Sequence, residues 1–255
     1  MKLKSASFTR FIRYPVWKLD SLRYAGNRFY CPMCGGNFNR MKPFVGSFSL
    51  RGVETDHYTA NAICPRCHSE IRQRFITEFI RVRTDLLKRR QRVIHFAPEI
   101  GLYKLLGDAD IDYVPADIDP SQFIDAIYAD ITEIPFQEEF DHVICIHVLE
   151  HIPDDRKALR EIYRVLKPGG RALLAIPIYG DTTYEDPTLD FSGREKQYGK
   201  GDHLRLNGLD FAEKLKSVGF QVELFSFDDI PGEYLDRSVK SPHIESDKYL
   251  FYCTK

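Results

Sequence analysis

The 255-residue sequence lacks the features that mark several specialised classes of protein. It has no apolar run near the ~18–20 residues that a membrane-spanning helix needs. Its first residues are basic, but they contain no continuous apolar core and no small-residue cleavage site, so no secretory signal is expected. Internal repeats and low-complexity segments are also missing. We therefore expect a cytoplasmic protein, whose six cysteines are reduced or bound to metal rather than joined in disulfides.

An overall excess of one charge is missing as well, but the net charge of −1 hides a division along the chain. Residues 1–92 hold 19 basic and 6 acidic side chains, whereas the remainder holds 17 basic and 31 acidic ones. Such asymmetry predicts a basic region that faces an anionic partner, such as nucleic acid, a phosphorylated substrate or an anionic membrane surface. Alternatively, the basic region packs against the acidic part of the same chain.

Four of the six cysteines form two similar motifs, Cys31-Pro-Met-Cys34 and Cys64-Pro-Arg-Cys67, with 29 residues between them. Each motif places two thiolates on a tight turn, and two such turns together offer four sulfur ligands to a tetrahedral Zn²⁺ ion. Four thiolates leave no open position for a catalytic water, so the site is expected to be structural. The spacing predicts a zinc ribbon within a basic N-terminal segment, residues 1–70.

Other arrangements of these residues remain open at the level of sequence. His57 and His68 are near the cysteine motifs and can replace one of the ligands. Four unrelated thiols, or a redox pair, are further alternatives. Between the motifs, apolar residues in short runs indicate short strands with turns at Gly46 and Gly52.

The rest of the chain alternates between helical and strand-like patterns. Apolar residues at three- and four-residue spacing predict a connecting helix over residues 71–91. From residue 92 to 255, seven nearly all-apolar strands and three amphipathic helices alternate. This pattern predicts an α/β domain with a doubly wound, mostly parallel sheet of seven strands. The last two strands have no helix between them, so we expect them to pair antiparallel.

The carboxyl ends of such strands form the ligand crevice of an open α/β sheet. Asp117 ends the second strand and Asp130 the third. An acidic residue after the second strand can accept hydrogen bonds from ribose hydroxyls, and one after the third can accept from an adenine amino group. The first strand ends in a loop with a single glycine, Gly101, where a phosphate-binding loop has several. The two aspartates meet the requirements of an adenosine ligand, but aspartate is also common in turns, and a loop that binds no cofactor is an equal alternative.

Three segments, Asp130–Phe136, Phe140–His151 and Leu166–Gly170, closely resemble the late motifs of class I S-adenosylmethionine-dependent methyltransferases of the small-molecule, type 11-like group. The quinone-methylating enzymes are examples of that group. The resemblance covers roughly residues 92–255, and it implies a Rossmann-like methyltransferase domain that uses S-adenosylmethionine. A cysteine module followed by a helix is similar to that of uncharacterised bacterial methyltransferases with an N-terminal zinc ribbon. Some ribosomal-RNA guanine methyltransferases also carry a zinc module ahead of the domain.

The resemblance implies a set of cofactor-binding residues. In the loop after the first strand, Ala97 and Glu99 take the places of two family glycines and Gly101 keeps the third. Glu99 is expected to receive the amino group of the cofactor, and His147 to contact its methionine part or the substrate. The remaining expected contacts are to the ribose and the adenine, from Asp117, Ile118, Asp130 and Ile131.

The long polar segment 180–206 is expected to be a lid or substrate loop. Within it, His203 beside Asp202 is a candidate general base, with His147 as a second candidate catalytic residue; a histidine that only orders the loop is the alternative. Motifs near the fourth strand favour a small molecule or glycan precursor as methyl acceptor, whereas the basic N-terminal region favours RNA. The sequence His147-Val148-Leu149 stands where methyltransferases of exocyclic base amines carry Asn/Asp-Pro-Pro-Tyr, which argues against such an amine as the methyl acceptor. A non-catalytic zinc-ribbon adaptor on a methyltransferase-like scaffold is the alternative function.

Overall fold

The computed structural model describes residues 22–229 and 246–255. The first 21 residues of the predicted basic segment lie outside this part of the chain. No helix within the described residues is long and apolar enough to cross a membrane. The strands of the N-terminal part are β1 (Ala25–Cys31), β2 (Gly36–Phe38), β3 (Lys42–Leu50) and β4 (Val53–Ile63). The helices are α2 (Ile71–Arg83), α3 (Ile100–Gly107), α4 (Asp155–Val165), α5 (Phe191–Tyr198) and α6 (Phe211–Val218).

A seven-stranded sheet forms the centre of the molecule. Its strands are β5 (Arg92–Phe96), β6 (Asp112–Asp117), β7 (Ile127–Tyr128), β8 (Phe140–Ile146), β9 (Leu166–Ala175), β10 (Gln221–Ser226) and β11 (Tyr249–Thr254). They lie in the order β10-β11-β9-β8-β5-β6-β7. The five strands β5 to β9 are parallel, and β11 pairs antiparallel with both β9 and β10. The predicted doubly wound fold and the late antiparallel pair are both confirmed.

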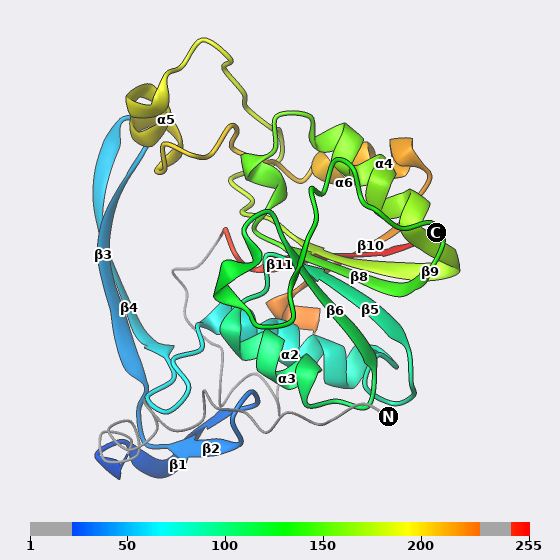
Figure 1. The fold of residues 1–255 in the computed structure, drawn as a ribbon. Coiled ribbons are helices and arrows are strands. Elements are labelled where there is room, and N and C mark those ends of the chain that lie inside the picture. Colours follow the sequence, from blue (N-terminus) through cyan, green and yellow to red (C-terminus); the bar gives the residue numbers. More distant parts are fainter. Residues whose placement is uncertain (1–21, 230–245) are drawn as a thin grey trace.

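Helices cover both faces of this sheet, with α2 and α3 on one side and α4 and α6 on the other (Figure 1). The central strand β8 shows why its sequence is almost entirely apolar. Val143 and Cys145 pack in the core beneath α4 and α6, whereas Ile144 and Ile146 pack in the core beneath α2 and α3. Because successive side chains of a strand point to opposite faces, a strand buried on both faces needs apolar residues at every position.

The connecting helix is shorter than the sequence predicted. It runs from Ile71 to Arg83 rather than to residue 91, and Thr84 has an extended backbone. The Thr84 hydroxyl donates to the Ile80 carbonyl at 2.6 Å and accepts from the Leu86 backbone at 3.2 Å. These bonds replace the next helical turn, so the apolar pattern beyond residue 84 belongs to a turn that buries Leu86.

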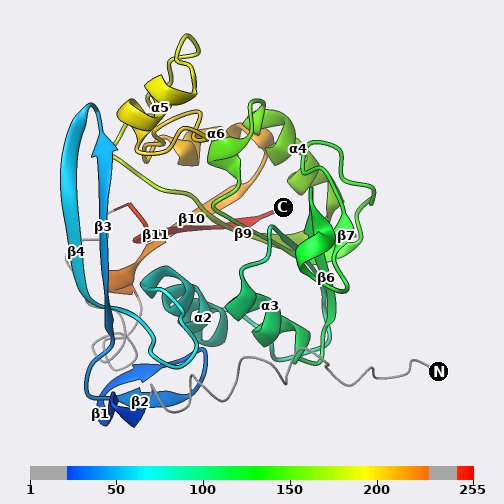
Figure 2. The same ribbon diagram turned by 60° about the vertical axis from the view of Figure 1, so that its left-hand side comes forward.

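The N-terminal part also differs from the prediction of short strands. β3 and β4 form one long antiparallel hairpin that turns at Arg51 and Gly52, both with positive φ. Gly46 lies within β3, opposite the backbone of His57, and does not form a turn. The hairpin extends from the cysteine motifs to α5 at the far end of the molecule (Figures 1 and 2). The predicted loop over 180–206 therefore contains a helix, which contacts the hairpin tip.

Candidate active site and cysteine cluster

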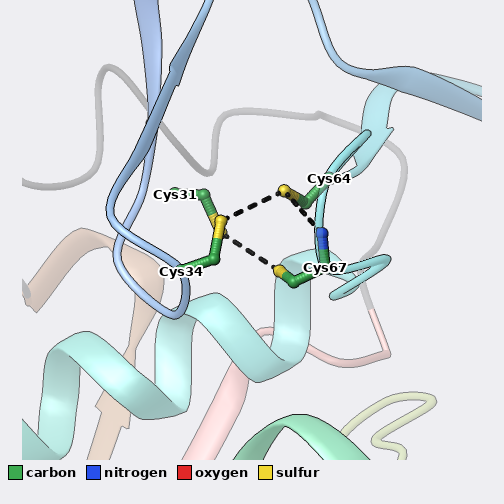
Figure 3. A group of neighbouring side chains, drawn as sticks. All are labelled: Cys31, Cys34, Cys64 and Cys67. Atoms are coloured by element: carbon green, nitrogen blue, oxygen red, sulfur yellow. Dashed lines mark hydrogen bonds between the residues drawn. The ribbon is translucent and has the colours of Figure 1, made fainter. Parts of the chain in front are cut away.

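The two cysteine motifs come together as the sequence predicted (Figure 3). The Sγ atoms of Cys31 and Cys67 lie 3.6 Å apart, and those of Cys34 and Cys64 lie 3.7 Å apart. All four sulfur atoms lie within 4.8 Å of one another. Among the described side chains, no histidine joins this group; the side chain of His57 lies outside the description. The arrangement offers four sulfur ligands from two turns.

A buried arginine holds the second cysteine motif against the helix that follows it. The Arg74 guanidinium donates to the carbonyls of Ser69 at 2.6 Å and Ala62 at 3.0 Å, and its side chain is fully buried. Burial lowers the pKa of Arg74, while the four nearby cysteines act in the opposite direction. The guanidinium thus provides positive charge beside a group that carries negative charge when its thiols are ionised.

The loop between β5 and α3 contains the three residues expected to replace the glycine-rich motif. Ala97 adopts a φ of +46°, a conformation that favours glycine, and its backbone N–H donates to the Ala116 carbonyl at 2.9 Å. A Cβ atom on Gly101 would lie 2.2 Å from the Sδ atom of Met33. The glycine therefore allows the first cysteine motif to pack against α3, and its contact with a cofactor stays a prediction.

The third residue of this loop, Glu99, takes part in an ion-pair network that the sequence did not indicate. Arg72 on α2 donates to Glu99 at 2.6 Å and to Asp247 at 3.1 Å. Burial lowers the pKa of Arg72, but the two carboxylates outweigh it and the net shift is upward. Only one Glu99 oxygen is used: Oε2 is buried and has no hydrogen-bond partner within residues 22–229 and 246–255. Arg72 was missed because its helix contains many arginines and no sequence signal separates it from them.

The ends of β6 and β7 lie side by side, since Asp117 pairs with Tyr128 in the sheet. The Asp117 carboxylate accepts from the Asp119 backbone at 2.8 Å. The Asp130 carboxylate likewise accepts from the backbone and hydroxyl of Thr132, at 2.8 and 2.9 Å. These short-range bonds fix both carboxylates at the carboxyl edge of the sheet.

The two apolar residues that follow these aspartates differ in exposure. Ile118 is 60% exposed beside Asp117, whereas Ile131 is only 4% exposed. An exposed branched side chain next to the strand end gives a flat ligand such as adenine a surface to pack on. Ile131, in contrast, belongs to the core on the α4 and α6 face, so its side chain offers little free surface.

His147 lies just after β8 with a φ of +53°, and its backbone N–H donates to the Ala175 carbonyl at 2.8 Å. Its Nδ1 atom is 3.7 Å from Glu150 Oε1, and its Nε2 atom is 3.5 Å from Asp247 Oδ1. Burial is the main reason that the pKa of His147 falls well below its usual value, and nearby cations lower it further. The imidazole is therefore neutral near pH 7.

A second group of ionisable side chains lies next to His147. Glu150 and His151, on the short 3-10 helix Leu149–His151, meet His203 from the 180–206 segment. Burial raises the pKa of Glu150 to about 7 and lowers that of His203 to about 4. The Asp202 carboxylate, expected to assist His203, lies 3.6 Å from Nδ1 of His151 instead. The His203 ring also packs on His151, with ring centroids 4.9 Å apart.

A cavity of about 770 Å³ lies beside this group. One wall is the β3–β4 hairpin, with Phe44, Ser47 and Leu50. The opposite wall comes from segments after β9, after α5 and before β11, and it includes His203 and Asp247. The hairpin closes over this space because its tip donates from Arg51 and Gly52 to the carbonyls of Gln197 and Lys196, both at 2.9 Å.

Comparison with known proteins locates the similarity in the sheet domain. Residues 106–174 match a family model described as a methyltransferase domain. A demethylmenaquinone methyltransferase from Clavibacter sepedonicus is 35% identical over 77 residues, which are 30% of this chain and 26% of that relative. The chain thus spans about a quarter of the length of this curated relative.

Solved structures extend the similarity over the fold. An S-adenosylmethionine-dependent methyltransferase from Mesorhizobium loti matches with a TM-score of 0.54 at 13% identity, covering 71% of this chain and 98% of that one. The cyclase SpnF matches with a TM-score of 0.50 at 15% identity, covering 88% and 89%. The chain therefore has the seven-stranded Rossmann-like methyltransferase fold, with a methyltransferase domain segment at residues 106–174.

Proposed function

We propose that this protein is an S-adenosylmethionine-dependent methyltransferase that acts on a small molecule. One observation carries the proposal: the carboxyl ends of adjacent parallel strands bring the Ala97 turn, Asp117 with Ile118, Asp130 and His147 to one edge of the sheet. Ligands of open α/β sheets bind at this edge. The match of residues 106–174 to a methyltransferase domain supports the same reaction class.

The unpaired Glu99 oxygen supports S-adenosylmethionine as the ligand. A buried carboxylate oxygen without a partner costs free energy, and the amino group of the cofactor would satisfy it. Arg72, held by Glu99 and Asp247, places a positive charge at the same loop for the cofactor's carboxylate. Asp117 would accept hydrogen bonds from the ribose hydroxyls, and Ile118 would pack on the adenine ring. Asp130 and the backbone of Ile131 would contact the edge of that ring.

The cavity beneath the hairpin is the proposed acceptor site. Its volume, about 770 Å³, is within the usual range for small-molecule pockets. The name of the curated relative, a demethylmenaquinone methyltransferase, also favours a small acceptor. Methyl transfer depends chiefly on holding the nucleophile in line with the S–CH₃ bond. His203, which lines the cavity, and His147, which lies 3.5 Å from the cavity residue Asp247, are proposed to act on the acceptor.

We also propose that the cysteine cluster binds a structural Zn²⁺ ion. Four sulfur atoms at about 2.3 Å from a tetrahedral ion lie about 3.8 Å from one another. The separations of 3.6 and 3.7 Å across the cluster fit this geometry. The zinc would fix the base of the β3–β4 hairpin, because β4 leads directly into the second cysteine motif. In this way residues 22–70, the N-terminal module, would contribute a wall of the acceptor site.

Calorimetric titration with S-adenosylmethionine tests the proposed cofactor. Binding is expected in the native protein and is expected to weaken at least about ten-fold in Asp117→Ala, because one charge-assisted hydrogen-bonding group is lost. Asp112→Ala is the matched control, since Asp112 starts the same strand at the opposite edge of the sheet. No binding in the native protein would contradict the proposal and favour the non-catalytic adaptor.

The dependence of binding and turnover on salt concentration distinguishes RNA, the alternative acceptor, from a small molecule. Binding to RNA through the basic region must weaken steeply as salt rises, because neutralised phosphates release counterions. Turnover of a small, uncharged acceptor in the cavity is expected to change little over the same range of salt. Steeply salt-dependent RNA binding that competes with turnover would overturn the small-molecule assignment.

A further inference from the structure

Three side chains with metal-ligating atoms converge beside the proposed acceptor cavity, well apart from the cysteines in sequence. Glu150 and His151 come from the 3-10 helix after β8, and His203 comes from the segment after α5. One ligand atom of each lies within 4.8 Å of the others. Two imidazoles and one carboxylate at this spacing form a common donor set for first-row transition metals.

The carboxylate of this group is buried without a hydrogen bond from any described residue, although the His147 Nδ1 atom lies 3.7 Å from it. Glu150 is 1% exposed, and neither of its oxygens accepts a hydrogen bond within the described part of the chain. The Nδ1 atom of His203, which is 3% exposed, is likewise buried and without a hydrogen bond to any described residue. Buried polar atoms in native proteins nearly always have a partner, so several orphans in one place point to a missing ligand.

The orientation of His151 favours a cation as that ligand. Its Nδ1 atom lies 3.1 Å from the Asp202 carbonyl and, because a carbonyl oxygen only accepts, donates a hydrogen bond to it. The Nε2 atom then carries the lone pair, and it lies 4.0 Å from Glu150 Oε1. Histidines that bind metals are commonly oriented by a carbonyl or carboxylate at the other ring nitrogen in this manner.

A buried arginine fixes the two halves of the group together. Arg205 donates to the carbonyls of Leu149 at 3.0 Å and Ile152 at 2.9 Å, on either side of Glu150 and His151. In addition, the Leu204 backbone donates to the Glu150 carbonyl at 2.9 Å. The segment that carries His203 is therefore bound to the segment that carries Glu150, and the three ligands are preorganised.

We propose that Glu150, His151 and His203 bind a divalent transition metal ion, distinct from the ion of the cysteine cluster. Three protein ligands leave positions open for exogenous oxygen atoms. Because His203 also lines the cavity, those positions would face the acceptor site. As a ligand, the neutral imidazole of His203 would not serve as the general base that the sequence suggested.

The consequence for chemistry rests on the proposed methyltransferase function. A divalent ion beside the cavity favours an acceptor with a hydroxyl group, since a bound cation lowers the pKa of such a group. The hydroxyl would lose its proton to water, its oxygen would form a bond to the methyl carbon, and the S–CH₃ bond would break to leave S-adenosylhomocysteine. The proposed acceptor class is therefore an oxygen nucleophile on a small molecule.

Manganese binding tests the metal site without relying on activity. Mn²⁺ prefers oxygen and nitrogen ligands to thiolates, so it should leave the zinc in the cysteine cluster in place. With the zinc-loaded protein, we expect the electron paramagnetic resonance signal of free Mn²⁺ to fall until one equivalent per chain is bound. Glu150→Gln and His203→Gln should each weaken binding by about ten-fold or more, the size of loss seen even for outer-shell changes.

Two control substitutions isolate the site. Glu213→Gln changes an exposed glutamate on α6, and His142→Gln changes a buried histidine at the other end of β8; both should bind Mn²⁺ as the native protein does. Failure of the native protein to bind Mn²⁺ or Zn²⁺ beyond the cysteine site would overturn the proposal, even if the variants did not fold. Equal binding by the native protein and the two site variants would overturn it too.

The metal experiment and the cofactor experiment test the two proposals separately, so that either proposal can be contradicted without the other. Mn²⁺ binding that survives in Asp117→Ala, together with native S-adenosylmethionine binding, supports both proposals. Mn²⁺ binding without any S-adenosylmethionine binding would keep the metal site and remove the methyl-transfer chemistry assigned to it.

Discussion

The Arg72 guanidinium lies 2.6 Å from the Glu99 carboxylate and 3.1 Å from that of Asp247. A single side chain thus connects α2, the loop after β5 and the segment before β11. All three groups are mostly buried, so water does not screen the two ion pairs strongly. The same contacts hold α2 against the edge of the sheet where the cofactor is proposed to bind.

Replacing Arg72 with methionine should therefore affect both stability and ligand binding. We expect a loss of about 3–5 kcal/mol in the free energy of unfolding, because two charged hydrogen bonds are removed and two buried carboxylates lose their partner. S-adenosylmethionine should also bind more weakly. Denaturant unfolding and calorimetry measure the two effects. Arg89→Met is the control, since Arg89 is 69% exposed in a surface ion pair with Asp85 and should change stability by no more than about 0.5 kcal/mol.

Removal of the proposed zinc ion should loosen the N-terminal module, residues 22–70, before it affects the sheet domain. The core beside the cysteines is small, with Phe38 and Met41 as its buried members apart from Cys31 and Cys64. A core of this size gives little hydrophobic stabilisation, so the proposed zinc ion would contribute much of the folding free energy there. A chelator should increase proteolysis between residues 22 and 70 while residues 92–175 stay protected.

Cysteine substitutions separate zinc loss from general damage. Cys34→Ser should reduce the zinc content measured by mass spectrometry and reproduce the proteolysis pattern. Cys145→Ala, in the core of the sheet domain, should keep its zinc although it creates a small cavity. A Cys34→Ser protein with full zinc content and unchanged proteolysis would contradict the assignment of the cluster.

Filling the cavity beneath the hairpin should impair the acceptor and spare the cofactor. Ser47 lines the cavity from β3, and Ser47→Trp would occupy part of its volume of about 770 Å³. We expect a higher KM for the acceptor, or lost turnover, with S-adenosylmethionine affinity unchanged. Val45 is 71% exposed and does not line the cavity, so Val45→Trp should behave as the native protein does. If Ser47→Trp lost affinity for the cofactor but kept its KM for the acceptor, the acceptor site would have to lie elsewhere.

Acid should destabilise the fold partly through His142. Burial lowers the pKa of His142 to about 4, despite the opposing influence of Asp85 and Asp141. An unfolded histidine has a pKa of about 6.5, so the unfolded state binds more protons below that pH. The contribution to stability is complete above pH 6.5 and is lost as the pH falls towards 4. Its total size is about 3 kcal/mol at the conversion of about 1.4 kcal/mol per pKa unit.

The matched variant for this prediction is His142→Gln, which cannot titrate. Its free energy of unfolding should fall less between pH 6.5 and 4 than that of the native protein. His95, whose pKa burial lowers to about 3, remains in both proteins, so its effect cancels in the difference. Parallel pH profiles for the two proteins would show that His142 does not contribute.

Local sequence patterns were enough to predict the main architecture. Apolar strands alternating with amphipathic helices indicated the doubly wound sheet, because burial on both faces demands apolar residues throughout a strand such as β8. Two CPxC turns indicated the four-sulfur cluster, since each turn positions its own pair of thiols. The predicted turn at Gly52 is correct, but the predicted turn at Gly46 is wrong, because Gly46 lies within β3; the length of the hairpin was therefore missed.

Only the tertiary structure brought together groups from distant segments. Nothing near His203 in the sequence indicates that Arg205 donates to the Leu149 carbonyl and so fixes this segment to the helix of Glu150. Nor does it indicate that the Asp202 carbonyl accepts a hydrogen bond from His151. In the same way, Arg72 resembles every other arginine of its helix until Glu99 and Asp247 fold against it. Sequence periodicity reports which face of an element is buried, because that depends on neighbours one turn or one strand pair away. The partners of a buried charge depend on how the elements pack, so they are decided only when the chain has folded.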